Sequence, residues 1–192
     1  GSALGANGLA AGAFVATNTA AAAGGLAWAV IEWIRDKKPT SIGVATGGVA
    51  GLVAITPAAG FVGPVSAILI GAGSSVIGFI GVAFLKPKFG YDDSLDAFGV
   101  HGLGGIWGAL ATGLFASTAV NPNGADGLFF GNAAQFGIQA VSVAVTIVYA
   151  LIGTFIICKV VDAVIGLRVS SEEERIGLDL TQHHESGYTV LD

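Results

Sequence analysis

His101 is the residue of this sequence with the clearest capacity for chemistry, because it lies inside a long stretch without charges. Residues 97–125 contain no Asp, Glu, Lys or Arg. A polar ring in hydrocarbon must face the protein interior or a cavity, since an unsatisfied polar group there is costly. On a regular helix the imidazole shares one face with small side chains, which are Ala97, Gly104, Gly105, Gly108 and Thr112.

Two interpretations of this histidine are open. It can line a pore and hydrogen-bond a passing polar solute, or it can satisfy a hydrogen bond between two helices. An ionisable residue within a membrane is by default a functional hypothesis, which favours the pore. A dry site favours the neutral imidazole, in which one nitrogen donates and the other accepts a hydrogen bond. Such a ring suits a small uncharged or proton-exchanging solute better than a bare cation.

Three aspartates precede the histidine. Asp92 and Asp93 fit the role of helix caps, since carboxylates stabilise the positive end of a helix. Asp96 starts the same helix and is expected either to cap it or to shape the inner mouth of a pore.

The composition places these residues in a membrane protein. The chain of 192 residues is 53% hydrophobic and only 11% charged, with a mean hydropathy of +0.77. The net charge of -5 gives no indication of a nucleic-acid partner. We expect no cofactor, no metal site and no enzymatic activity. Four uncharged stretches are each long enough to cross a bilayer as a helix, namely residues 9–31, 41–85, 97–125 and 127–158.

The stretch 41–85 is too long for one span and is broken at TPAAGFVGP. Pro57 and Pro64 lack backbone donors, and the hydroxyl of Thr56 can satisfy a group that Pro57 leaves free. Residues 1–169 are therefore expected to form a membrane domain, and residues 170–192 a cytoplasmic tail. The predicted helices are at about residues 9–33, 41–57, 64–85, 97–116 and 130–164.

All eight lysines and arginines fall on one side of this five-helix arrangement. The positive-inside rule then places the tail in the cytoplasm and Gly1 outside. The sequence contains no Met and no signal peptide, so we expect it to be a piece of a longer product or a processed one. Three motifs predict close helix packing, namely Gly8-xxx-Gly12, Gly47-xxx-Gly51 and Gly104-xxx-Gly108.

The tail, SSEEERIGLDLTQHHESGYTVLD, differs in composition from the rest of the chain. Ser170 or Ser171 precedes a run of glutamates, which predicts an N-cap and an acidic first turn. After Gly177 the tail is polar with isolated apolar residues. From composition alone it is expected to be solvated and partly disordered.

The stretch DDSLDAFGVHGLGGIWGALATGLFA, followed by a long last helix and VIGLRVSSEEERIGLDLTQHHESGY, closely resembles the ammonium transporter (Amt/Mep/Rh) family in its prokaryotic Amt form. The resemblance covers essentially the whole chain. It implies an all-α polytopic membrane fold of eleven helices, with two inverted five-helix repeats around a pore, assembled as a homotrimer. This chain would be the last part of the second repeat plus the eleventh helix.

The resemblance also implies roles for individual residues. His101 matches the second of two pore histidines that hydrogen-bond one another, and the first is expected in the other repeat. Ser2 matches the serine of an outer ammonium recruitment site. Thr56 matches a threonine that supports an acidic residue below that site. Asp96 and Ala97 match positions near the cytoplasmic end of the pore.

In the tail the resemblance marks Gly177, Asp179, Thr181 and Tyr188, within a segment that packs on a neighbouring subunit. Thr181 falls where plant relatives carry a regulatory phosphothreonine. The family's cytoplasmic regulator is a PII-type signalling protein that blocks the inner mouth of the pore. The resemblance implies a multi-pass protein of the plasma membrane.

The expected function is ammonium transport, in which NH4+ is recruited outside and deprotonated, NH3 passes the histidine pair, and the proton is regained inside. Without the other repeat, this chain alone is expected to fold poorly and to transport nothing. Two alternatives remain open. The protein can be a sensor that binds ammonium and signals through its tail, or a channel for another small neutral solute such as CO2.

Overall fold

The computed structural model describes residues 3–187, and within that range the chain is helical without strands. It forms two compact units, Gly1–Val145 and Thr146–Asp192. Two short segments, η1 and η2, are π-helical, and η3 is a single 3₁₀ turn. The elements in chain order are α1 (Gly8–Asp36), α2 (Ser41–Ile55), α3 (Pro64–Ile80), η1 (Gly81–Leu85), α4 (Lys86–Phe89), η2 (Phe98–Leu103), α5 (Gly104–Phe115), η3 (Leu128–Phe130), α6 (Ala133–Val164), α7 (Ser171–Ile176) and α8 (Leu178–Thr181).

Local sequence accounts for where these helices begin and end. The side chains of Asn7 and Thr40 accept backbone hydrogen bonds at the N-termini of α1 and α2, at 3.1 and 2.8 Å. Helix α3 begins at Pro64, where a missing N–H costs nothing. The break predicted at Pro57 is present, although α2 ends at Ile55, two residues before that proline, and not at residue 57.

All five predicted helices are present, and four are long and apolar enough to cross a membrane in the range that the structure describes. Helix α2 is the exception. Its 15 residues correspond to about 22 Å, less than the roughly 30 Å of a hydrocarbon core. The fifth crossing and the domain boundary after residue 169 therefore stay predictions. The four long helices are Gly8–Asp36, Pro64–Phe89, Phe98–Phe115 and Ala133–Val164.

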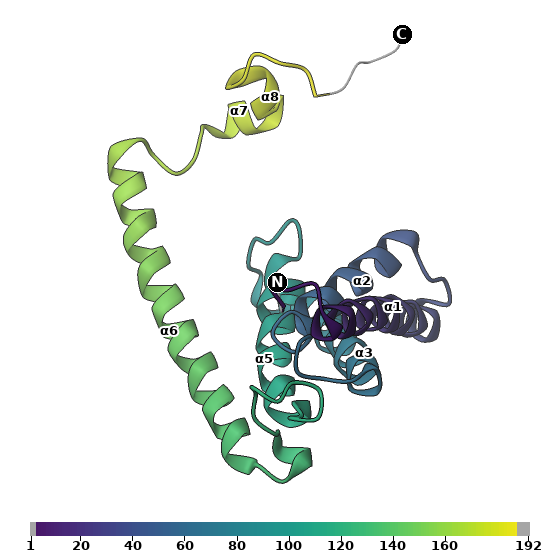
Figure 1. Cartoon of the computed structure of the whole chain (residues 1–192). Helices are drawn as coiled ribbons and strands as arrows, with labels where there is room; N and C mark the ends of the chain where they lie inside the picture. The colour runs from purple at the N-terminus through teal and green to yellow at the C-terminus, as the bar shows by residue number, and fades with distance from the viewer. Residues whose placement is uncertain (1–2, 188–192) are drawn as a thin grey trace. The chain divides into compact units, whose positions relative to one another are not determined.

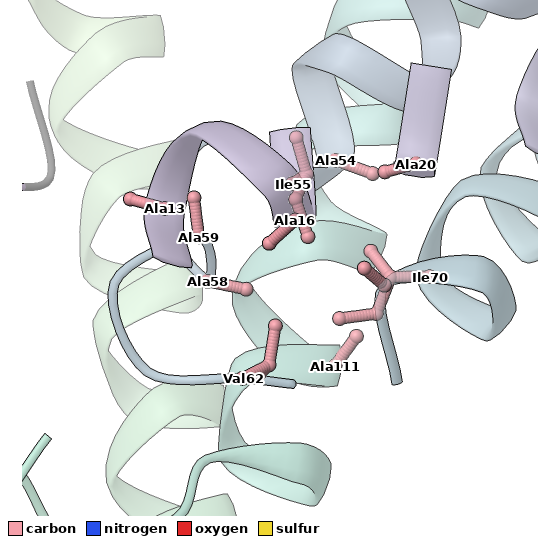
Figure 2. Close-up of a cluster of buried hydrophobic side chains, with 11 residues drawn as sticks. Ala13, Ala16, Ala20, Ala54, Ile55, Ala58, Ala59, Val62, Ile70 and Ala111 are labelled. Atoms are coloured by element: carbon pink, nitrogen blue, oxygen red, sulfur yellow. The ribbon is translucent and has the colours of Figure 1, made fainter. Parts of the chain in front are cut away.

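Helices α1, α2, α3 and α5 pack together in the first unit (Figure 1). Their common core consists mainly of alanine, with three larger aliphatic side chains (Figure 2). Small residues let helix backbones approach, which favours association where the hydrophobic effect between helices is absent. The core residues are Ala13, Ala16, Ala20, Ala54, Ile55, Ala58, Ala59, Val62, Ala67, Ile70 and Ala111.

Glycines bring the backbones into direct contact. A Cβ added to Gly108 on α5 would lie 2.2 Å from the carbonyl oxygen of Ala54 on α2. The Gly47 and Gly104 motifs also pack closely, so both predictions are confirmed. In contrast, a Cβ on Gly8 or Gly12 meets no atom within 4 Å among the described residues.

Gly108 and Gly105 provide a matched pair for testing this packing. Gly108→Ala is expected to lower the melting temperature by several degrees, because overpacking a tight contact costs about 1–3 kcal/mol. Gly105→Ala, three residues away on the same helix, meets open space and is expected to leave stability unchanged or slightly higher. Thermal unfolding of the purified membrane protein measures both. Equal melting temperatures for the two variants would contradict the packing.

Candidate functional site: the histidine helix and the tail

His101 lies on η2, and its side chain is exposed on the surface of the first unit. Ala97, one turn earlier, is also exposed, and a Cβ added to Gly105, one turn later, meets no atom within 4 Å. These three residues form an open face on the histidine helix, the continuous run of η2 and α5. The only polar side chain of the three is the imidazole.

The rest of the predicted stripe lies on another face, so that part of the prediction was wrong. Gly104, Gly108 and Thr112 are buried, with Gly104 near Ser74 of α3 and Gly108 against α2. In a regular α-helix His101 and Gly108 would lie only about 20° apart. The π-helical turn contains one extra residue and so rotates the following segment by about 100°.

The N-terminus of the histidine helix is capped by Asp93. Its two carboxylate oxygens accept hydrogen bonds from the backbone N–H groups of Ala97 and Phe98, at 2.8 and 2.9 Å. The predicted capping role is confirmed for this aspartate. The helix start is therefore fixed by a side chain four residues away, within the connecting loop.

Asp96 forms an ion pair with Lys86. The sequence predicted for this lysine only that it lies on the cytoplasmic side. The Lys86 ammonium lies 2.7 Å from Asp96 Oδ1 and also donates to the carbonyl oxygen of Asp93, at 2.6 Å. Both paired side chains are about one-third exposed. The sequence signal for this ion pair was a basic residue at the end of one apolar helix and an acidic residue at the start of the next. A role for Asp96 at the inner pore mouth stays a prediction.

Thr56 acts as expected at the end of α2. Its backbone N–H bonds the carbonyl of Val53 at 3.3 Å, because Pro57 has no N–H to offer that oxygen. The carbonyl of Leu52 thereby loses its regular partner. The Thr56 hydroxyl replaces that partner and donates to this oxygen at 2.7 Å.

The tail residues marked by the sequence form a folded segment rather than an irregular one up to Gly187. Gly177 has a φ of 113° and connects α7 to α8. The Thr181 hydroxyl donates to the Gly177 carbonyl at 3.0 Å, and Asp179 accepts from the Gly187 N–H at 2.9 Å. Ser2 and Tyr188, two further predicted site residues, lie outside the described residues.

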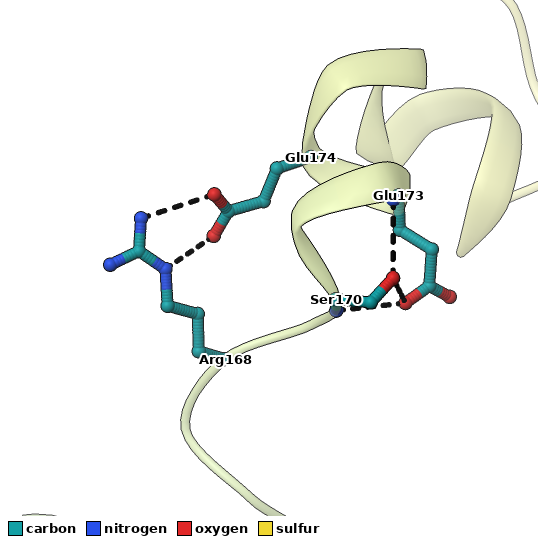
Figure 3. Close-up of polar contacts among 4 residues, drawn as sticks. All are labelled: Arg168, Ser170, Glu173 and Glu174. Atoms are coloured by element: carbon teal, nitrogen blue, oxygen red, sulfur yellow. Dashed lines mark hydrogen bonds and ion pairs between the residues drawn. The ribbon is translucent and has the colours of Figure 1, made fainter.

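Figure 3 shows the start of the tail, where Ser170 is the N-cap, as predicted, and also forms a capping box with Glu173. The N–H and hydroxyl of Ser170 donate to the Glu173 carboxylate, at 3.0 and 2.8 Å, and these bonds lower the pKa of Glu173. Arg168 binds both carboxylate oxygens of Glu174 and lowers the pKa of that group. The Gly187 N–H lowers the pKa of Asp179 in the same way.

Taken together, the helices and the site define a polytopic α-helical membrane protein. Its first unit is packed through glycine and alanine, and it presents one imidazole on an open face. No group of three or more His, Cys, Asp or Glu side chains within residues 3–187 could hold a metal ion.

The sequence profile of the Ammonium Transporter Family matches residues 1–188, and the chain belongs to this family. It is 56% identical over 188 residues to the ammonium transporter of Bacillus subtilis (strain 168), covering 98% of this chain and 46% of that protein. It is 50% identical over 190 residues to ammonium transporter Amt1 of Archaeoglobus fulgidus, covering 98% and 47%. The chain thus spans about half the length of the curated relatives it matches.

Solved structures agree with this assignment. Saccharomyces cerevisiae Mep2 superposes with a TM-score of 0.80 at 35% identity, over 85% of this chain and 38% of that one. A structure described as a sensor Amt protein superposes with a TM-score of 0.79 at 29% identity, over 92% and 42%. The predicted family and fold class are confirmed.

The lowered carboxylate pKa values predict how the tail responds to pH. A group whose pKa is lowered by folding contributes stability above its ordinary pKa and loses that contribution as pH falls through the lowered value. The tail is therefore expected to loosen as pH falls below the ordinary values of 4.5 for Glu and 3.8 for Asp. Backbone amide NMR signals of the tail, recorded in nanodiscs between pH 7 and 3, measure this.

Asp179→Asn should loosen the 177–187 segment already at pH 7, whereas Glu172→Gln serves as the control on α7. Tail signals that do not change with pH would contradict the assigned hydrogen bonds.

Proposed function

We propose that this chain forms one wall of an ammonium-conducting pore, with His101 as the residue that hydrogen-bonds the solute. One observation carries the proposal: the imidazole lies on the open face of an otherwise uncharged helix. In hydrocarbon such a ring would be unsatisfied. A second wall and a polar solute would satisfy it. Membership of the ammonium transporter family supports ammonium as that solute.

The transported species at the histidine is NH3 rather than NH4+. Moving an intact cation into an apolar pore is far more costly than moving the neutral molecule. The mechanism therefore begins with recruitment of NH4+ on the outer side, where Ser2 contributes to binding, followed by deprotonation. NH3 then passes a pair of imidazoles, one of them His101, which replace the hydrogen bonds lost to water. The proton is regained on the inner side, near Asp96 and Ala97.

The proposed setting follows the charge distribution and the family. The N-terminus of this chain lies outside, and the tail lies in the cytoplasm, because the basic residues flank the helix ends on that side. The protein is a homotrimer of the plasma membrane with one pore per subunit. The tail, through Gly177, Asp179, Thr181 and Tyr188, packs on a neighbouring subunit, and a PII-type protein binds the cytoplasmic face.

Uptake of labelled methylammonium into vesicles that contain the complete transporter tests the proposal. His101→Leu removes both hydrogen-bonding nitrogens and is expected to reduce uptake by tenfold or more, since two lost hydrogen bonds at about 1 kcal/mol each correspond to roughly 30-fold in rate. His184→Ala, in the tail, is the matched control and should retain uptake. Ammonium should compete with methylammonium, whereas CO2 should not. Uptake that is absent in the wild type, or unaffected by His101→Leu, would refute the proposal.

A second candidate function is ammonium sensing through the tail. The structural similarity to a sensor Amt protein favours it. A sensor would change the NMR signals of the tail on ammonium binding without significant uptake. A transporter shows uptake, so the vesicle assay separates the two.

A further inference from the structure

Two π-helical segments pack against each other in the first unit. Segment η1 continues α3, and segment η2 begins the histidine helix. They approach through glycines, since a Cβ added to Gly81 would lie 2.9 Å from the Cα of Gly99. Each π-turn holds one residue more than an α-turn and is rare in proteins, often occurring at functional sites.

The end of η1 that joins α3 and the end of η2 that joins α5 are fixed by the packed core. On α3, the Ser75 hydroxyl donates to the carbonyl of Gly24 on α1 at 2.7 Å. On α5, Gly108 contacts the backbone of Ala54 on α2. Neither α3 nor α5 can rotate without breaking these contacts.

The other two ends, the last residue of η1 and the start of η2, meet at Lys86. This lysine directly follows η1, and its ammonium binds Asp96 Oδ1 and the Asp93 carbonyl oxygen. Asp93 in turn caps the histidine helix through the N–H groups of Ala97 and Phe98. The lysine therefore holds the start of η2 at a set distance from the end of η1. With both ends of η2 fixed, the extra residue stays between them as a π-turn.

The backbone at Asp96 supports this account. Its φ of 55° is in the left-handed region, which is unfavourable for a residue with a side chain, although Asp and Asn tolerate it better than most. The ion pair with Lys86 offsets that cost. Without the pair, the loop would be free to take up the extra residue, and η2 could become an α-turn.

We propose that Lys86 and Asp96 are positioning residues, whose ion pair holds η2 in its π-helical register and keeps His101 on the open face. This role deepens the proposed function, because the transport readout assumes ammonium transport. Loss of the pair lets residues 98–103 become α-helical. His101 then rotates by about 100° toward the packed side of the helix.

Asp96→Asn is the sharpest variant, because it removes the charge while keeping the shape and the tolerance for a left-handed backbone. Lys86→Gln removes the other partner. The exchange of both residues, Lys86→Asp with Asp96→Lys, should restore the pair with its sign reversed, and Lys37 shows that a lysine in this chain adopts a φ of 64°. Lys88→Gln, on the same short helix α4 but exposed, is the matched control.

Cryo-electron microscopy of the complete transporter reads the register directly. Residues 98–103 are expected to be α-helical with His101 rotated in Asp96→Asn, and π-helical in the wild type, the exchange and the control. Methylammonium uptake should fall on the order of fivefold in maximal rate in the single variants, the factor corresponding to one weak ion pair. The KM, which the outer site sets, should stay within about twofold of the wild type.

An unchanged π-turn in both Asp96→Asn and Lys86→Gln would overturn the inference, even if ammonium transport stands. A lost π-turn supports the register role even if the wild type transports no ammonium, so the two proposals fail separately. If Asp96→Asn protein does not accumulate, Lys86→Gln decides the question by the same two readouts, and the exchange decides it by the register of residues 98–103. A fall in the Lys88→Gln control equal to that of Lys86→Gln would also count against the ion pair.

Discussion

Direct contact between helix backbones is the constraint on which the rest of this structure depends. The carbonyl oxygen of Ala54 leaves no space for a side chain at Gly108, and the same holds for the Ala20 oxygen opposite Gly71. Buried serine hydroxyls on α3 then donate to carbonyl oxygens of α1 and α2. In a bilayer these contacts contribute what the hydrophobic effect contributes in water, because lipid and helix surfaces are equally apolar. The helices therefore have few alternative arrangements, and the glycines of each helix set its position.

This constraint decides where the imidazole of His101 lies. Helix α5 is held by Gly108, whereas the start of the histidine helix is held by Asp93 and Lys86. The two anchors do not match the pitch of one continuous α-helix, and the π-turn accommodates the difference. The open face at the histidine is thus a result of two packing requirements in different parts of the unit.

Much of the fold followed from the sequence, because charges and prolines mark helix ends directly. Pro57 and Pro64 separated α2 from α3, and the N-cap at Ser170 was visible as a serine before glutamates. The face that surrounds His101 was predicted only in part, because a period of 3.6 residues assumes an uninterrupted α-helix. Nothing in the local sequence marks the extra residue of a π-turn. The ends of that turn are fixed by Gly108 against α2 and by the pairing of Lys86 with Asp96, and hydrophobic periodicity contains neither contact.

The two ends of the first unit are held by different forces. Where α1 ends and α4 begins, Lys86 pairs with Asp96, and the Arg35 guanidinium lies over the rings of Phe79 and Phe84, at 5.3 and 5.2 Å. At the opposite end, the loops are joined by a backbone hydrogen bond from Ser117 to Phe61, at 2.9 Å. Charge interactions depend on ionic strength and on neighbouring charges, whereas backbone hydrogen bonds scarcely do. A charged partner or a change of salt can therefore alter the geometry of the end that carries Lys86. The start of the histidine helix lies at that end, so such a change reaches the segment that carries the imidazole.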